Sequence, residues 1–190
     1  MRRQLPAAVV VFVLFSVLTG LVYPLVVTGI AQVAFGTRAD GSLVERGGVV
    51  VGSALIGQMF AGPGYFHSRP SAAGDGYDAM ASGASNLGPS NPELLDAVAE
   101  RKAEYRRANG LAAGDRVPVD AITGSGSGLD PDISPANARL QARRVAEARG
   151  VPLERVLRLV DEAAKDRSLA FLGDPCVNVL ALNLALDERL

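Results

Sequence analysis

One uncharged stretch near the start of the chain constrains the fold more than any other feature. From Gln4 to Thr37 the sequence contains no Asp, Glu, Lys, Arg or His, a run of 34 residues. A helix needs about 20 apolar residues to cross the hydrocarbon core of a bilayer, which is roughly 30 Å thick. Signal peptides have shorter apolar regions of ~7–15 residues that end at a small-residue cleavage site. A buried core helix would usually keep a polar face. The run therefore predicts a transmembrane anchor over residues 1–35.

The charges that flank this run predict its orientation. Arg2 and Arg3 come directly before it, whereas charges of both signs follow it. Basic residues prefer the cytoplasmic side of a membrane. We therefore expect a single-pass protein with a cytoplasmic N-terminus and the rest of the chain on the periplasmic or extracellular side.

One face of the predicted anchor indicates packing against a partner helix. Ser16 and Gly20 are four residues apart, and Tyr23 continues the same stripe. Small residues at this spacing allow two membrane helices to approach closely. Pro24 cannot donate a hydrogen bond to the carbonyl of Gly20, so we expect a kink there. The alternative is that Gly and Pro are simply common in membrane helices.

Composition limits what the remaining chain can do. All 20 acidic residues and 17 of the 19 basic residues follow the anchor, which gives this part a net charge of −3. That charge argues against binding to nucleic acid. Cys176 is the single cysteine and His67 the single histidine, so an internal disulfide is excluded and a zinc site is not expected. We expect Cys176 to be a buried, inert thiol.

The rest of the pattern predicts an α+β fold: one N-terminal transmembrane helix, a linker over residues 36–47 and one mixed helix/strand extracytoplasmic domain over residues 48–190. Short strands are expected at 42–44, 48–52 and 117–122 because β-branched residues there are bounded by glycine or proline. A helix with Val156, Leu159 and Val160 facing inward is expected to begin near Pro152.

Three helices are expected to begin with a capping residue followed by proline. The pairs are Asn91-Pro92, Ser134-Pro135 and Asp174-Pro175. The first two helices should end before Asn109-Gly110 and at Gly150. The third segment also contains β-prone valines at 177 and 179, so a strand remains an alternative there.

No catalytic constellation emerges from the sequence. The loop Gly124–Gly128 is rich in glycine, but no Gly-Lys-Ser/Thr follows, and an ordinary turn is favoured over a phosphate cradle. A membrane-anchored hydrolase would have to use Asp120, Asp130 and His67, for which no nucleophile–base pair is evident. A ligand-sensing domain is the other alternative.

A set of short segments resembles the C subunit of the high-affinity potassium-transporting P-type ATPase, the KdpC family. These segments are Tyr23-Pro24 with Thr28-Gly29, residues 52–58, Tyr65-Phe66-His67 with Arg69-Pro70-Ser71, Ser82-Gly83 with Ser85-Asn86-Leu87, residues 90–94, residues 127–130, Ile133-Ser134-Pro135, Gln141 with Arg144-Val145-Ala146, Ala148-Arg149-Gly150, and residues 177–180 with Leu182-Asn183 and Ala185-Leu186-Asp187. The resemblance covers nearly the whole chain. The family's usual Gln-x-Pro-Arg-Val pattern lacks its proline here and reads Gln141-Ala142-Arg143-Arg144-Val145.

The resemblance implies a non-catalytic subunit in a bacterial inner membrane. Its partners would be membrane lipid, a potassium-channel-like subunit and an ATP-hydrolysing P-type subunit whose ATP affinity it raises as a chaperone. It implies no cofactor of its own, because ATP is bound by the partner subunit. The glutamine that matches Gln141 is linked in the family to nucleotide contact. Candidate partner contacts are Ser16, Gly20, Tyr23, Pro24, Tyr65, Phe66, Arg69, Ser85, Asn86, Asp130 and Arg144.

The predicted topology conflicts with a direct nucleotide contact. Gln141 lies about a hundred residues beyond the anchor, and no second spanning run returns the chain to the cytoplasm. We therefore expect Gln141 to influence ATP affinity only through the partner subunits.

Overall fold

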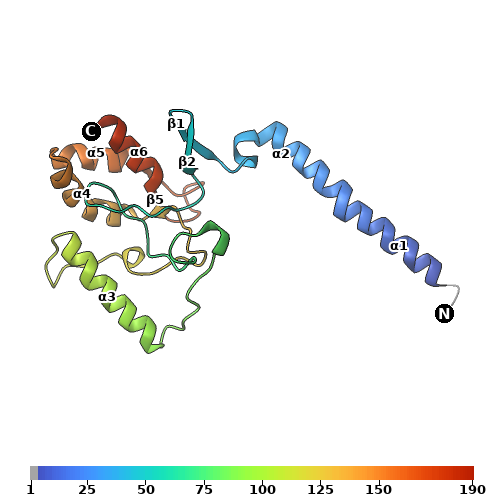
Figure 1. Cartoon of the computed structure of the whole chain (residues 1–190), viewed down its shortest axis with the longest axis horizontal. Helices are drawn as coiled ribbons and strands as arrows, with labels where there is room; N and C mark the ends of the chain where they lie inside the picture. Colours follow the sequence, from blue (N-terminus) through green and yellow to red (C-terminus); the bar gives the residue numbers. More distant parts are fainter. Residues whose placement is uncertain (1–3) are drawn as a thin grey trace. The chain divides into compact units, whose positions relative to one another are not determined.

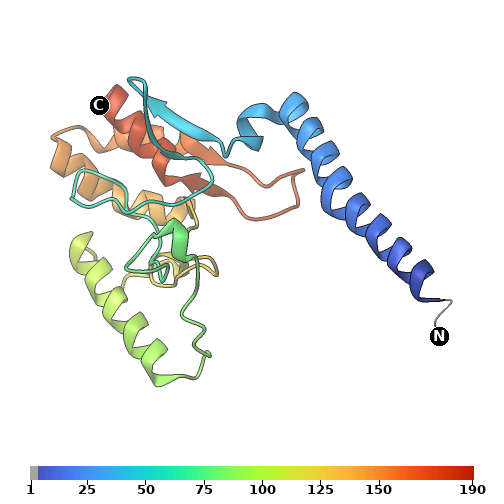
Figure 2. The same cartoon turned by 45° about the vertical axis from the view of Figure 1, so that its right-hand side comes forward.

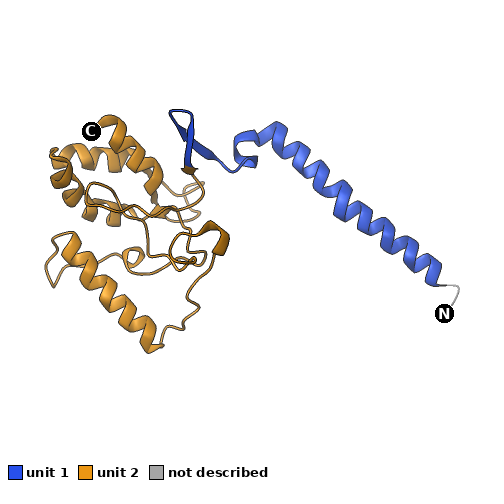
Figure 3. Cartoon of the chain, in the orientation of Figure 1, with its two compact units in different colours: residues 1–51 blue, residues 52–190 orange. Residues whose placement is uncertain are grey.

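The computed structural model describes residues 4–190 and divides into two compact units, residues 1–51 and residues 52–190 (Figure 3). Arg2 and Arg3, on which the predicted orientation depends, lie outside the described residues. The sequence-based division at residues 35 and 47 stays a prediction.

The first unit is dominated by one long apolar helix (Figure 1). It consists of α1 (Leu5–Val17), the π-helical turn η1 (Leu18–Val22) and α2 (Tyr23–Ala39). Within the described residues this is the one helix long and apolar enough to span a membrane: it has 35 residues, and an 18-residue stretch of it has a mean hydropathy of 2.6. A two-stranded hairpin of β1 (Leu43–Arg46) and β2 (Val49–Ser53) follows.

The helix changes its hydrogen-bond pattern in the turn before Pro24. The N–H of Tyr23 donates to the carbonyl of Leu18, five residues back, as in a π-helix. Pro24 has no N–H, and its ring crowds the carbonyl four residues earlier, which explains the wider turn. A second irregularity lies further on, where Phe35 has φ −142° and ψ 36°.

The second unit combines a small sheet with four helices. The strands are β3 (Asp132–Ile133), β4 (Ala164–Lys165) and β5 (Cys176–Asn178), in the antiparallel order β3-β5-β4. The helices are α3 (Pro92–Ala108), α4 (Pro135–Arg149), α5 (Leu153–Ala163) and α6 (Val179–Arg189), with short 3-10 turns η2 (Ala79–Ala81) and η3 (Val119–Ala121). The predicted α+β class with one apolar N-terminal helix is confirmed.

The apolar core lies between α4, α5, α6 and β5, which gather in one half of the unit (Figures 1 and 2). Its members are Phe66, Ile133, Ala138, Ala142, Val145, Ala146, Val156, Leu159, Val160, Val177, Val179, Leu182 and Leu186. The predicted inward face of α5 is confirmed by the burial of its two valines and Leu159. Helix α3 stands apart from this core and has no fully buried side chain.

Two of the three predicted helix starts are confirmed. The Asn91 side chain accepts a hydrogen bond from the N–H of Glu93 at 2.9 Å, and Ser134 accepts from Asn137 at 3.1 Å. The third is wrong: Asp174-Pro175 precedes a strand, and α6 begins later with Asn178 as its cap. Val177 is fully buried and pairs with Ile133 and Ala164 on either side, so tertiary pairing decides for the strand.

Two further sequence-based predictions are corrected. Residues 117–122 contain the turn η3 at Val119–Ala121 and form no strand, because the Asp120 carboxylate accepts from the N–H and hydroxyl of Ser134 at 2.8 and 2.9 Å. Cys176 is half-buried in β5 and not fully buried. Partial burial and the neighbouring Asp132 raise the pKa of its thiol.

Candidate functional site

The segment Gly62–His67 has no sheet partner and is held by amide side chains from two helices. Asn183 on α6 accepts from the N–H of Phe66 at 2.8 Å and donates to its carbonyl at 2.9 Å. Gln141 on α4 does the same for His67, at 2.7 and 3.0 Å. Each amide thus satisfies one residue's backbone as a neighbouring strand would. We call these four residues, Asn183 and Gln141 with Phe66 and His67, the amide clamp.

Gln141 has no hydrogen-bonding capacity left for a ligand. Besides its two bonds to His67, its Nε2 donates to Asn137 Oδ1 at 2.9 Å and its Oε1 accepts from Arg144 Nη2 at 2.8 Å. A primary amide has two donor hydrogens and two acceptor lone pairs, and all four are used. The side chain is also 2% exposed. A nucleotide contact by Gln141 would therefore require displacing one of these bonds.

Two arginines of α4 complete the support of this segment. Arg144 Nη1 donates to the carbonyls of Pro63 at 2.7 Å and Tyr65 at 3.0 Å. Arg149 donates to the carbonyl of Gly64 at 2.7 Å and pairs with Asp187 at 2.7 Å. Its guanidinium also lies 4.9 Å from the centre of the Tyr65 ring, within cation–π range. The segment is thus fixed residue by residue through charge-assisted bonds to its carbonyls.

Burial shapes the electrostatics around the clamp. It lowers the pKa of His67; the Arg144 charge adds to this effect, while the bond from Nε2 to the carbonyl of Gly62, 2.9 Å long, opposes it. Burial also lowers the pKa of Arg144 and raises that of Tyr105, whose hydroxyl donates to Asn137 Oδ1 at 2.8 Å. The local environment therefore favours neutral His67 and neutral Tyr105.

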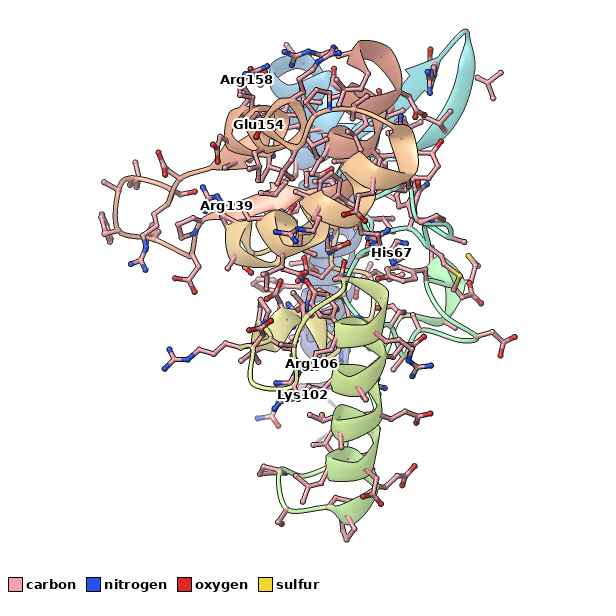
Figure 4. The ribbon with its side chains drawn as sticks, turned by 90° about the vertical axis from the view of Figure 1, so that its left-hand side faces the viewer. His67, Lys102, Arg106, Arg139, Glu154 and Arg158 are labelled. Carbon is pink, nitrogen blue, oxygen red and sulfur yellow. The ribbon has the colours of Figure 1, made fainter. Side chains whose placement is uncertain are left out.

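Two members of the clamp, Gln141 and His67, line a cavity of about 420 Å³. The opposite wall comes from α3, and Figure 4 shows His67 between that helix, marked by Lys102 and Arg106, and the helices of the core. The cavity is lined by His67, Arg69, Arg101, Glu104, Tyr105 and Gln141, among others. Its lining contains charges of both signs, and its glutamine and tyrosine already hydrogen-bond to other residues of the protein.

A second set of contacts connects the residues after His67 to the loop Gly124–Gly128 and its neighbour Asp130. Arg69 Nη1 pairs with Asp130 Oδ2 at 2.7 Å, and Nη2 donates to the carbonyl of Gly124 at 3.3 Å. Gly128 has φ +70°, and a Cβ there would lie 2.7 Å from the carbonyl oxygen of Gly83. Close approach of two loops explains this glycine.

The three residues considered for a hydrolase, Asp120, Asp130 and His67, all make hydrogen bonds or ion pairs with other residues of the protein. Asp120 accepts from Asn137 Nδ2 at 2.9 Å in addition to its two bonds from Ser134. Asp130 pairs with Arg69, and the His67 ring bonds to Gly62. Among residues 4–190, no three His, Cys, Asp or Glu side chains are grouped so as to hold a metal ion.

The structure brings only some of the predicted contact residues together. Tyr65, Phe66, Gln141 and Arg144 meet at the clamp, but the Phe66 side chain is fully buried in the core and presents no surface. Arg69 and Asp130 pair with each other.

The remaining predicted contacts lie elsewhere. Ser85 and Asn86 line a separate cavity of about 330 Å³ near the glycine loop. Ser16 and Gly20 line a shallow apolar hollow on the first unit, while Tyr23 and Pro24 begin α2.

The sequence did not reveal that Asn183 and Asn137 belong to the hydrogen-bond network that holds the segment Gly62–His67. Asn183 lies among the apolar residues of α6, next to Leu182 and one turn from Val179 and Leu186, all of them buried. A lone amide on the buried side of an apolar helix must find a hydrogen-bond partner, which is the signal that could have identified it.

Comparison with known proteins gives one consistent result. The family model described as "K+-transporting ATPase, c chain" (KdpC) matches residues 5–188. A potassium-transporting ATPase KdpC subunit of Mycobacterium tuberculosis (strain ATCC 25618 / H37Rv) is 59% identical over 188 residues, covering 99% of this chain and all of the relative. KdpC subunits of Rhodospirillum rubrum and Caulobacter vibrioides (strain NA1000 / CB15N) are 58% and 57% identical over 189 and 190 residues, which is 100% of this chain and 97% and 95% of theirs.

Proposed function

The chain belongs to the KdpC family, and from this premise we propose that it is the non-catalytic accessory subunit of an ATP-driven potassium uptake complex. The observation that carries the proposal is the match over residues 5–188, with 57–59% identity across the full length of relatives named as subunits of potassium-transporting ATPases. In this role it assembles with and stabilises a pore-like subunit and an ATP-hydrolysing subunit.

The proposed topology places the second unit outside the cytoplasm of a bacterial cell. The support is Leu5–Ala39, the one candidate span within residues 4–190, and the two arginines before it in the sequence. Alkaline phosphatase fused after Leu190 should be active, whereas a fluorescent cytoplasmic reporter fused there should stay dark. The reverse pair of results would invert the topology.

The proposed effect on ATP is indirect. ATP binds to the hydrolysing subunit, and this chain raises its ATP affinity by favouring one conformation of that partner. The support is the state of Gln141, which is buried and uses both donors and both acceptors within the protein. The chain itself needs no cofactor in this mechanism.

The test compares complexes with and without this chain. Potassium-stimulated ATP hydrolysis should show a higher apparent KM for ATP when the chain is absent, and fewer partner subunits should survive purification together. The full-length chain in detergent should show no saturable ATP binding by calorimetry. Unchanged assembly and an unchanged KM without the chain would overturn the proposal.

Gln141→Ala distinguishes the indirect effect from a direct nucleotide contact. We expect it to loosen the clamp and raise the KM for ATP only together with a loss of complex stability. Asn183→Ala is the matched control, because it loosens the same segment from the other helix. If only Gln141→Ala changed the KM, with complex stability intact, a direct contact would be favoured.

A further inference from the structure

The cavity of about 330 Å³ between α3 and the loop Gly124–Gly128 has an uneven charge. Its lining offers hydroxyl, amide and glycine backbone groups, but it contains one charged residue, Arg101 of α3. Glu104, three residues further along α3, lines only the larger neighbouring cavity. The lining therefore carries one positive charge and no negative charge.

Arg101 is held beside the loop without a carboxylate partner. The residue is half-buried, and its Nη1 donates one long hydrogen bond, of 3.5 Å, to the carbonyl of Ile122. Among residues 4–190, no Asp or Glu forms an ion pair with it. A guanidinium has five N–H donors in a planar fork that suits the oxygens of an anion. Most of these donors remain available to a ligand in the cavity.

The Arg69 side chain fixes the direction of two peptide groups in the loop. It donates from Nε to the carbonyl of Thr123 at 3.4 Å and from Nη2 to that of Gly124 at 3.3 Å. In a planar trans peptide the N–H points opposite to the C=O, so the N–H groups of Gly124 and Ser125 are directed away from Arg69. Gly124 and Ser125 line this cavity and Arg69 does not. The two N–H groups therefore lie on the cavity side of the loop.

These N–H groups and two side chains from a second loop have no acceptor in the part of the chain that the structure describes. Neither the N–H of Gly124 nor that of Ser125 donates to another residue, and the same holds for the Ser85 hydroxyl and the Asn86 amide. Ser85 and Asn86 line the same cavity. Backbone N–H groups beside a positive charge are a usual arrangement for binding an oxyanion. An ordinary turn accounts for the glycines of the loop but not for the unpaired arginine.

We propose that this cavity binds a phosphate group with one negative charge, either free phosphate or the phosphodiester of a lipid headgroup. Arg101 pairs with its oxygens from α3, the N–H groups of Gly124 and Ser125 bind from the loop, and Ser85 and Asn86 donate from the second loop. Donors from three segments suit a tetrahedral group with four oxygens better than a planar carboxylate, which has two.

The charge of the cavity also limits the size of the ligand. One guanidinium balances one negative charge but not the several charges of a triphosphate, which would repel one another without further cations. The cavity is thus compatible with the expected absence of ATP binding. Binding of this anion requires no partner subunit, so it is separate from the proposed function.

A bound phosphate would connect α3 to the rest of the second unit. This helix has no fully buried side chain, so few apolar contacts hold it in place. A ligand that binds the folded chain alone stabilises it by mass action. Phosphate should therefore slow amide hydrogen exchange in α3 more than in α5, which does not line the cavity.

An NMR titration of the full-length chain in maltoside micelles, which contain no phosphate, tests the site directly. Inorganic phosphate should shift the amide resonances of Gly124 and Ser125 in a saturable way. Sodium chloride at the same ionic strength is the control for screening and should not shift them. Equal shifts with chloride, or shifts that do not saturate, would overturn the proposal.

Arg101→Gln should weaken phosphate binding about tenfold or more, because it removes the positive charge of the lining. Arg107→Gln is the matched control, since it makes the same change on the same helix at an exposed position outside the lining, and it should leave the affinity unchanged. Equal losses in the two variants would indicate general charge attraction and contradict the proposed site.

Asn86→Gly tests the second loop independently. Asn86 has φ +54°, which glycine adopts without strain, so this variant removes the side chain and keeps the backbone. We expect binding to weaken about threefold, as for the loss of one neutral hydrogen bond. The thermal unfolding midpoint without phosphate should match that of the parent chain. Undiminished affinity in both Asn86→Gly and Arg101→Gln would place the phosphate elsewhere.

Mixed micelles that contain phosphatidylglycerol distinguish the two sources of the phosphate group. If the lipid alone shifts the resonances of Gly124 and Ser125 and added phosphate changes them no further, the ligand is the headgroup. If only inorganic phosphate shifts them, the ligand is the free anion. If neither does, the cavity binds no phosphate and the proposal is wrong.

Discussion

The apolar core and the segment Gly62–His67 lie side by side in the second unit and are stabilised in opposite ways. The core between α4, α5 and α6 is built almost entirely from aliphatic side chains. The segment contributes one buried apolar side chain, Phe66, and its backbone is satisfied by amide and guanidinium groups. Apolar burial is non-directional, whereas each amide contact requires one donor and one acceptor at a fixed distance.

This difference has a consequence for mutation. The core should tolerate volume-conserving apolar replacements, because its stabilisation depends on buried area and packing. The clamp should not tolerate them, because an apolar replacement leaves the backbone N–H and C=O groups of the segment buried without partners. Two adjacent residues of α6, Leu182 in the core and Asn183 in the clamp, allow a direct comparison.

Asn183→Leu should have the largest effect. It keeps a side chain of similar size but leaves the backbone N–H and C=O of Phe66 unpaired, and each unsatisfied buried group costs about 1–3 kcal/mol. We expect a loss of roughly 4 kcal/mol in the free energy of unfolding, measured by urea denaturation of the full-length chain in detergent. A loss below about 1 kcal/mol would show that water replaces the clamp without cost.

Leu182→Ala should have a similar or somewhat smaller effect through a different mechanism. It removes a fully buried side chain and leaves a cavity, for which about 2–5 kcal/mol is usual. Amide hydrogen exchange separates the two variants: Leu182→Ala should increase exchange throughout α4, α5 and α6, and Asn183→Leu mainly over residues 62–71. Identical exchange patterns would mean that the core and the clamp unfold as one unit.

Acidification should weaken the clamp before it weakens the core. The pKa of His67 is lowered in the folded state, mainly by burial, so the unfolded chain binds this proton more readily. The stability contributed by neutral His67 is fully present above the unfolded pKa of about 6.5 and is lost as the pH falls from there toward the lower folded pKa. Unfolding measured at pH 7.5 and pH 5.5 should show this loss, and His67→Gln should reduce it. An unchanged pH dependence in His67→Gln would assign the effect to other groups.

Arg139→Ala should change the free energy of unfolding least. It measures how much an exposed ion pair contributes to stability. Arg139 pairs with Asp161 at 2.8 Å, but both side chains are more than half exposed. Exposed ion pairs contribute about 0–1 kcal/mol, and salt screens them further. Urea denaturation at low and high salt should give nearly the same result for this variant and the parent. A loss above about 1 kcal/mol would mean that this exposed ion pair contributes more than such pairs usually do.

The elements that were predictable from sequence depend on neighbouring residues. Asn91 and Ser134 cap helices through bonds that span two and three residues, so the local pattern is sufficient. Asp174-Pro175 shows the same local pattern and fails, because the pairing of Val177 with two strands from elsewhere in the chain outweighs it. The turn at 119–121 was missed for the same reason, since Asp120 bonds to residues 14 and 17 positions away.

The sequence by itself determined the apolar N-terminal helix and the family. Both depend on consecutive residues: an uncharged run long enough to span a bilayer, and short motifs that can be compared directly with relatives. Only the tertiary structure decided what Gln141 and Asn183 do, because they bond to residues 74 and 117 positions away. It also decided that Leu169, Phe171 and Leu172 are exposed between β4 and β5, whereas equally apolar residues of α6 are buried. Burial and pairing are properties of the folded chain, and an apolar sequence alone does not say which surface will cover it.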